Sequence, residues 1–345
     1  MGWLNESRSV NYCFNSSKSV IMKIGQFSKQ TILTGAGWTK NWGGRLAWED
    51  LFSHPKIQSS DRLRRLLLAE SEFEKALALA SEQPYDIADR TLLEEAVSDA
   101  FVAMDDEVAD LQCRHLVDVN RAEQMLFRLC GQAGQRFRTS YLFTLNQDLW
   151  PERHLVNWRH CQAMPSLPEV SGTRDQCFFQ GGMGPYSSQF EMRPSENLDA
   201  SSIIGKFNVV KLHGSFNWRS SDGSATMVVG KAKADQIKAS PLLRWYFEIF
   251  KRVLFDGDVK LMIVGYGFGD DHVNEMIARG INDHGVKVFV WNTNPRIKEC
   301  ILRASHGPDI WKGLIGVSSR SFADVFTRDS PETEAYKNIC RAFFG

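Results

Sequence analysis

Five short apolar segments of the chain are each followed by glycines or polar residues that are typical of ligand sites. These groups are Gly35-Ala36-Gly37, Asn146 with Asp148, His213-Gly214, Gly265-Tyr266-Gly267 and Asn292. His213 is a candidate general base near neutral pH, and Asn146 can hold a water molecule through its carboxamide. Asp148 can orient a loop or hold a ribose hydroxyl. Each residue also has a purely structural alternative. His213 could be a buried histidine with its hydrogen bonds satisfied, Asn146 a turn residue that ends a strand, and Asp148 the cap of the next helix.

The first group lies in a glycine-rich loop that leads through Thr39 and Asn41 to Gly44. Its glycines let a ligand approach the main chain, and the amides of such a loop, with the N-terminus of a following helix, can bind phosphate. The loop is not the dinucleotide pattern G-x-G-x-x-G, because Lys40 replaces the third glycine, and no Walker lysine follows. Taken alone, it fits an ordinary strand-to-loop turn equally well.

The segments before the five groups have the length and composition of buried strands. They cover residues 27–34, 140–144, 209–212, 260–264 and 286–291, with a small extra strand at 227–229. Helical patterns follow several of them, at 241–256, 271–283, from 295 and at 332–343. This order predicts an α/β fold with a Rossmann-like, doubly wound parallel sheet. Ligands bind outside the carboxyl ends of such strands, so we expect the five groups to converge.

Two long segments are expected to interrupt this core. One carries helical stripes near 63–80, 92–111 and 120–132, and the other is rich in proline and glycine. We predict a Rossmann-like core formed by residues 27–48, 137–150 and 205–328. Residues 49–136 and 151–204 are the helical and loop-rich insertions. Residues 1–26 form a poorly ordered N-terminal segment, and residues 329–345 a C-terminal helix. Asp270 and Asp271 stand where a helix cap is wanted, and we expect them to serve as one.

Composition narrows the classes of function. The 345 residues include 41 Lys and Arg and 41 Asp and Glu, so charge gives no general case for binding nucleic acid or an anionic membrane. No apolar run is long enough to span a bilayer, and the first 20 residues lack the apolar core of a signal peptide, so we expect a cytoplasmic protein. Seven scattered cysteines without a C-x-x-C pair predict neither a zinc site nor a disulfide framework.

Together, the five groups resemble the sirtuin-like family. That family has a G-A-G loop, a T-x-N-x-D segment, here Thr144, Asn146 and Asp148, a strand ending in His-Gly, a glycine turn and a late strand ending in Asn, in this order. Protein-deacylating sirtuins usually carry a four-cysteine zinc module and a loop containing P-D-F-R, and this chain has neither. It is more similar to zinc-less bacterial sirtuin-like domains that consume NAD in anti-phage defence, some beside a translocase-like ATPase or an Argonaute-type partner.

The resemblance implies NAD as the substrate, with no zinc. It assigns catalysis to Asn146 and His213, and NAD binding to the residues that match the family motifs. These are Gly35, Ala36, Gly37, Thr39, Asn41, Gly44, Thr144, Asp148, Gly265, Tyr266, Gly267 and Asn292. The expected activity is hydrolysis of NAD to nicotinamide and ADP-ribose, which would deplete NAD in abortive infection.

Other readings stay open: NAD-dependent deacylation, ADP-ribosyl transfer, or a nucleotide-sensing subunit without turnover. A dehydrogenase is disfavoured by the failed dinucleotide pattern. We expect a homo-oligomer, an accompanying defence protein of the ATPase or Argonaute-like type, and no contact with a membrane or directly with nucleic acid.

Overall fold

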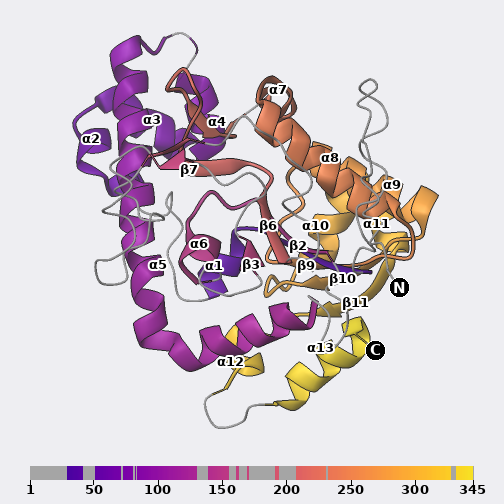
Figure 1. Ribbon diagram of the computed structural model, residues 1–345. Coiled ribbons are helices and arrows are strands. Elements are labelled where there is room, and N and C mark those ends of the chain that lie inside the picture. The colour runs from indigo at the N-terminus through magenta and orange to yellow at the C-terminus, as the bar shows by residue number, and fades with distance from the viewer. Residues whose placement is uncertain are drawn as a thin grey trace, which may run out of the picture.

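A parallel sheet of seven strands forms the centre of the protein in the computed structural model (Figure 1). The structure describes residues 29–41, 51–70, 73–80, 82, 84–129, 139–154, 161–162, 169–170, 191–193, 207–230, 232–327 and 332–344. The strand order is β11-β10-β9-β1-β2-β6-β3, and each neighbouring pair is parallel. The strands are β1 (Gln30–Thr34), β2 (Ser140–Thr144), β3 (Cys161–Gln162), β6 (Phe207–Lys211), β9 (Lys260–Val264), β10 (Lys287–Trp291) and β11 (Leu314–Ser318). The predicted α/β class with a Rossmann-like parallel sheet is confirmed.

Helices cover both faces of this sheet because alternate strand residues enter two different cores. Ile32 and Met262 belong to one core and Leu33 and Ile263 to the other. The first core includes residues of α1 (Gly37–Asn41), α6 (Trp150–His154), α12 (Phe322–Val325) and α13 (Glu334–Phe344). The second includes residues of α7 (Lys233–Ala239), α8 (Pro241–Phe255), α9 (Asp271–His284), α10 (Ile297–Arg303) and α11 (Gly307–Lys312).

Successive strands of the chain are placed first on one side of β1 and then on the other. The chain passes from β1 to β2 and β6 on one side, then continues through β9, β10 and β11 on the other. The switch point therefore lies between β1 and β9. In doubly wound sheets, the crevice at this point is the usual place for a ligand.

A helical segment separates β1 from β2 in the chain. It comprises η1 (Leu51–Ser53), α2 (Pro55–Gln58), α3 (Asp61–Ala69), α4 (Phe73–Ala80) and α5 (Ile87–Leu129). The expectation of separate helices near 92–111 and 120–132 is wrong, since α5 is one helix of 43 residues that runs down the left of the molecule and bends to continue below the large sheet (Figure 1). No glycine or proline interrupts this stretch, so nothing in the backbone chemistry ends the helix near residue 112.

A smaller sheet, ordered β4-β5-β7-β8, was not predicted. Its strands are β4 (Glu169–Val170), β5 (Met192–Arg193), β7 (Gly214–Arg219) and β8 (Ala225–Met227), so the small strand expected at 227–229 lies two residues earlier. β7 begins directly after His213 because Gly214 turns the chain with a φ of +70°. A Cβ on Gly214 would lie 2.0 Å from the Thr226 carbonyl oxygen, so β8 could not approach a larger residue.

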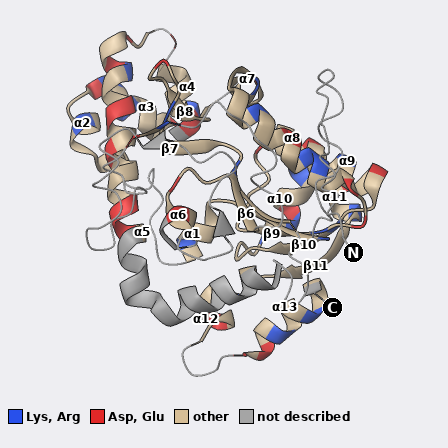
Figure 2. Ribbon diagram, in the orientation of Figure 1, with Lys and Arg blue, Asp and Glu red and all other residues tan. Residues whose placement is uncertain are grey.

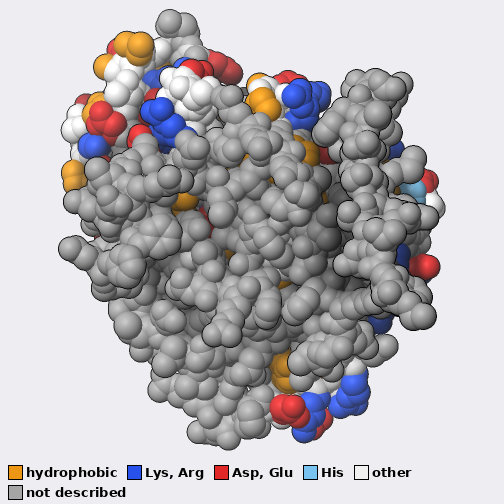
Figure 3. Space-filling model, in the orientation of Figure 1, with side chains coloured by type: hydrophobic (Ala, Val, Ile, Leu, Met, Phe, Trp, Pro, Cys, Tyr) orange, Lys and Arg blue, Asp and Glu red, His pale blue; other side chains and the backbone are white. Residues whose placement is uncertain are grey.

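Charged side chains lie mainly on the helices around the large sheet (Figure 2). On the face in Figure 3, the charged side chains that are described lie around the rim: over the helical segment at the upper left, near α7 at the top, along the right edge and over α13 at the lower edge. Within the described parts of the chain, no helix combines the length and the apolar character needed to cross a membrane.

Candidate functional site

The five residue groups lie beyond the carboxyl ends of five adjacent strands. Two backbone hydrogen bonds continue the ladder past these ends: the Leu145 amide donates to Thr34 and the Leu212 amide to Thr144, both at 2.9 Å. Asn146 and His213 are the next residues along β2 and β6, which pair with each other. The groups at 35–37, 265–267 and 292 follow β1, β9 and β10 in the same way.

The two glycine turns at the switch point are packed against each other. The amides of Gly35 and Gly37 donate to the carbonyls of Val264 and Gly265, each at 2.9 Å. Gly265 has a φ of +64°, and a Cβ there would lie 2.5 Å from the Gly37 carbonyl carbon. These glycines therefore permit a close backbone contact, and the amides of Gly35 and Gly37 are already engaged. Ala36 lies between them.

The chain after Gly35 and Ala36 forms the short helix α1 rather than the expected loop, and it is described as far as residue 41, where the Asn41 side chain donates to the Gly37 carbonyl at 2.6 Å. The expected role of Gly44 lies outside the described residues.

Thr39 connects this loop to the segment after β2. Its hydroxyl donates to Asp148 Oδ2 at 2.6 Å and accepts from Asn146 Nδ2 at 3.2 Å. The other Asp148 oxygen accepts from the Trp150 amide at the start of α6, at 2.9 Å. Asp148 thus both orients the loop and caps a helix, the two structural roles that the sequence left open. The Thr144 hydroxyl accepts from the Asn146 amide at 3.1 Å and fixes the turn.

A buried ion pair that the sequence did not lead us to expect holds the segment after β2 in place. Lys211 Nζ lies 2.9 Å from Glu152 Oε1, and both side chains are at most 1% exposed. The same ammonium donates to the Asp148 carbonyl and, at 2.9 Å, to Ser215 Oγ. A lysine directly after Val209 and Val210 in a buried strand was the available signal, because a buried charge requires a partner.

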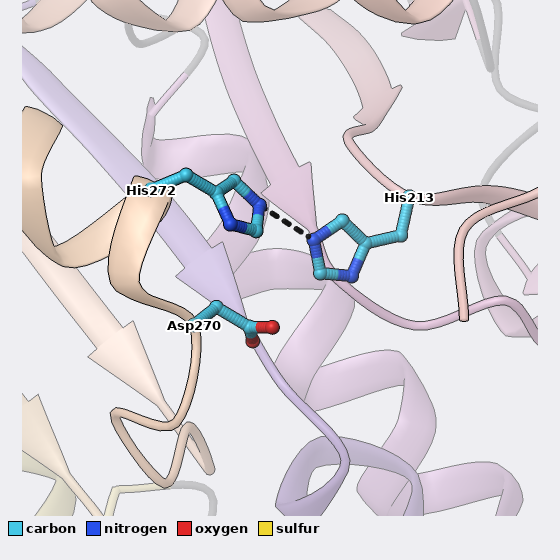
Figure 4. Close-up of side chains that lie close together, drawn as sticks. All are labelled: His213, Asp270 and His272. Carbon is cyan, nitrogen blue, oxygen red and sulfur yellow. Dashed lines mark hydrogen bonds between the residues drawn. The ribbon is translucent and has the colours of Figure 1, made fainter. Parts of the chain in front are cut away.

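His213 faces a second histidine, and the two Nε2 atoms are 3.1 Å apart (Figure 4). The backbone of Leu145 makes a hydrogen bond with His213 that raises the pKa of the ring, as a carbonyl accepting from a ring N–H does, and the Leu145 amide itself donates to Thr34. With Nε2 directed at His272, that donor is Nδ1. The neutral His213 therefore presents its Nε2 lone pair, and His272 donates its Nε2–H to it.

Burial lowers the pKa of His213 to about 3, although the nearby Asp270 carboxylate acts in the opposite direction. His213 is consequently an uncharged imidazole at neutral pH, with a proton on only one of its two ring nitrogens.

Asp270 does not act as the simple helix cap that was expected. It occupies the N-cap position of α9, but its side chain makes no capping hydrogen bond. Instead, Asp270 Oδ1 lies 2.7 Å from Lys233 Nζ, which is 2.6 Å from Glu74 Oε2 on α4. Burial alone would raise the pKa of Asp270, but the Lys233 ammonium holds it below its usual value.

The sequence reasoning also missed His272, which follows Asp270 by two residues. An acidic residue and a histidine at the start of the helix after β9 were the signal for it. A largely buried carboxylate is stabilised more by a cation than by a capping amide, which explains why the capping expectation is wrong.

Asn292 fastens the turn after β9. Its Nδ2 donates to the Tyr266 carbonyl at 3.0 Å, and its Oδ1 accepts from the Asn294 amide at 2.9 Å. The Tyr266 ring is buried, and its hydroxyl donates to Asn274 Oδ1 at 3.0 Å. A Cβ on Gly267 would meet no atom within 4 Å, so this glycine is the open member of the turn.

Residues 177–307 match the SIR2-like domain family. The chain carries a sirtuin-like domain. The matched segment includes His213, the 265–267 turn and Asn292, so the sirtuin-like assignment made from the motifs is confirmed. A SIR2-like domain indicates an NAD-dependent enzyme. A search of curated proteins finds no match to the chain.

The glycine loop after β1 and Asn146 precede the matched segment of the sirtuin-like domain. The hydrogen-bonded ladder nevertheless joins them to it, since β2 pairs directly with β6. The loop, Asn146 and His213 therefore belong to one edge of one sheet.

Proposed function

We propose that this sirtuin-like protein is an NAD⁺ hydrolase that cleaves NAD⁺ to nicotinamide and ADP-ribose. One observation supports this proposal above the others. A neutral, buried His213 is hydrogen-bonded to Leu145, so its ring is fixed at the carboxyl edge of the sheet, where Asn146 follows the neighbouring strand β2. A fixed imidazole and a carboxamide at the same edge can together hold a water molecule and accept its proton.

In the proposed reaction, the bond between the anomeric carbon and the nicotinamide nitrogen breaks, and nicotinamide leaves with the bonding electrons. The ribose then carries oxocarbenium-like positive charge. Water adds to the anomeric carbon and loses one proton, which gives ADP-ribose and H⁺. Asn146 positions this water, and His213 Nε2 accepts the proton or holds a ribose hydroxyl. Because His272 donates to the same nitrogen, water or ribose must displace this hydrogen bond.

The binding residues are assigned in the same proposal. The loop over 35–44 encloses the pyrophosphate and the nicotinamide ribose, with Thr39 and Asp148 fixing its shape. The 265–267 turn and Asn292 hold the adenosine end. The engaged amides of Gly35 and Gly37 give these glycines a shaping role, so other groups of the loop would donate to phosphate.

The test is to follow nicotinamide and ADP-ribose by chromatography with the purified full chain. We expect Asn146→Ala and His213→Ala each to lower turnover by about 100- to 10,000-fold, with much of the NAD binding retained. Asn338→Ala on the exposed face of α13 and His284→Ala at the far end of α9 serve as matched controls. Turnover by His213→Ala near that of the wild type would refute the assigned role.

Three alternatives are separated by extensions of this assay. Products that appear only with an acyl-lysine peptide would indicate a deacylase, and ADP-ribose attached to protein would indicate a transferase. Tight NAD binding without turnover, even with the native partner present, would indicate a sensor.

We further propose that NAD depletion serves anti-phage defence, in a homo-oligomer and beside a defence protein of the ATPase or Argonaute-like type. The zinc-less motif set supports this. Protection in a plaque assay that is lost with Asn146→Ala is the expected result.

A further inference from the structure

Three side chains of metal-ligand type converge at the start of α9: His213, His272 and Asp270 (Figure 4). One ligand atom from each lies within 4.8 Å of the others. Zinc binds His nitrogen and carboxylate oxygen at about 2.0–2.2 Å, so ligands of one ion lie up to about 4 Å apart. The three ligand atoms therefore need to approach one another by at most about 1 Å to bind one ion. We propose that these residues bind a divalent transition-metal ion.

Two of the three ligands already have the outer hydrogen bonds that orient metal-binding side chains. A ligating histidine typically donates its other ring N–H to a carbonyl, and a ligating carboxylate is itself hydrogen-bonded. His213 bonds the Leu145 backbone, and Asp270 is held by Lys233 at 2.7 Å. The Nε2 of His213 is therefore already directed inward. Only His272 must change, by moving its proton from Nε2 to Nδ1.

The charges around the cluster favour a cation. Glu74 and Asp270 are carboxylates and Lys233 is an ammonium, so these three described groups leave one negative charge when both histidines are neutral. Glu74 pairs with Lys233 from the opposite side and weakens its repulsion of an ion. Two nitrogens and one oxygen suit Zn²⁺, Co²⁺, Ni²⁺ or Fe²⁺ better than Mg²⁺ or Ca²⁺, which prefer oxygen ligands.

A metal at this place would use the lone pair that the proposed hydrolase needs. His213 Nε2 cannot both ligate an ion and accept a proton from water. A bound ion would therefore inhibit NAD cleavage, and a chelator would restore it. This consequence rests on the proposed function, whereas metal binding itself does not.

The experiment measures binding first, without NAD. The full chain is stripped with a chelator and titrated with Zn²⁺ by calorimetry and with Co²⁺ by absorption, which distinguishes nitrogen and oxygen ligands from cysteine thiolates. We expect one site that is lost in His272→Ala and in Asp270→Asn, and retained in His284→Ala on the same helix. Mg²⁺ should not compete.

Binding of Zn²⁺ by His272→Ala and Asp270→Asn with wild-type affinity would overturn the inference. So would a thiolate signature as the whole of the Co²⁺ spectrum, or no binding by the wild type. NAD cleavage is then assayed with and without Zn²⁺. Because binding is measured separately, absence of the metal site leaves the hydrolase proposal intact, and absence of hydrolysis leaves the metal site intact.

Discussion

The hydroxyl of Thr39 donates to Asp148 across 109 residues of sequence, at 2.6 Å, and both side chains are buried. The same hydroxyl accepts from Asn146. A single oxygen atom therefore joins the glycine loop after β1 to the segment after β2, which carries a proposed catalytic residue.

Replacing this oxygen should destabilise the protein and impair the site together. Thr39→Val keeps the shape but leaves a buried carboxylate and a buried amide without their partner, at a cost of about 1–3 kcal/mol. We expect a lower urea midpoint and slower NAD cleavage. Thr39→Ser restores the hydroxyl and is the matched control. Equal stability of the valine and serine variants would mean that the hydrogen bonds do not contribute.

The two glycines of the 265–267 turn should differ in their tolerance of a side chain. Gly265→Ala places a Cβ 2.5 Å from Gly37 at a φ of +64°, whereas Gly267→Ala meets nothing within 4 Å. The left-handed conformation alone costs about 1–2 kcal/mol, and the clash must also move the glycine loop. We expect Gly265→Ala to lower stability and NAD binding, measured by urea unfolding and calorimetry, and Gly267→Ala to unfold like the wild type. The reverse order would contradict the packing of the two turns.

The buried Lys211–Glu152 pair should be sensitive to loss of either partner. Lys211→Met leaves Glu152 buried and unpaired, which costs about 3–5 kcal/mol, while Lys211→Met with Glu152→Gln should recover part of this loss. Urea unfolding of the two single variants and the double variant measures the coupling. The exposed pair of Lys29 and Asp256, 2.8 Å apart, is the control, since Lys29→Met should cost at most about 1 kcal/mol. Similar losses at both sites would argue against a buried pair.

Stability should fall with acidification because His213 is buried as a neutral ring. Its pKa is about 3 in the folded protein, against about 6.5 in an unfolded chain. The unfolded state thus binds a proton that the folded state does not, so the free energy of unfolding decreases as the pH falls from about 6.5 towards 3. His213→Gln should show a shallower decrease in urea unfolding between about pH 7 and pH 4. Parallel curves for the two proteins would exclude this contribution.

Local sequence signals predicted most of the large sheet. β2 and β9 have the expected bounds, because short apolar runs that end in glycine or polar residues leave little choice of structure. The predicted break between two helices near residue 112 is wrong, since periodic apolar stripes do not show whether a helix continues from one stripe to the next. β7 was not predicted because its start depends on the contact of Gly214 with β8, which forms only after the chain has turned back.

The order of the motifs at the strand ends can be read from the chain alone, and it implies a parallel sheet in which Asn146 and His213 follow neighbouring strands. Which side chains complete the cluster depends on how helices that are distant in the chain pack together. Glu74, Lys233, Asp270 and His272 come from three separate parts of the chain, and each has an ordinary use on its own helix. Periodicity reports how a residue relates to its neighbours in sequence. A buried charge, by contrast, is stabilised by whichever partner the fold brings within a few ångströms.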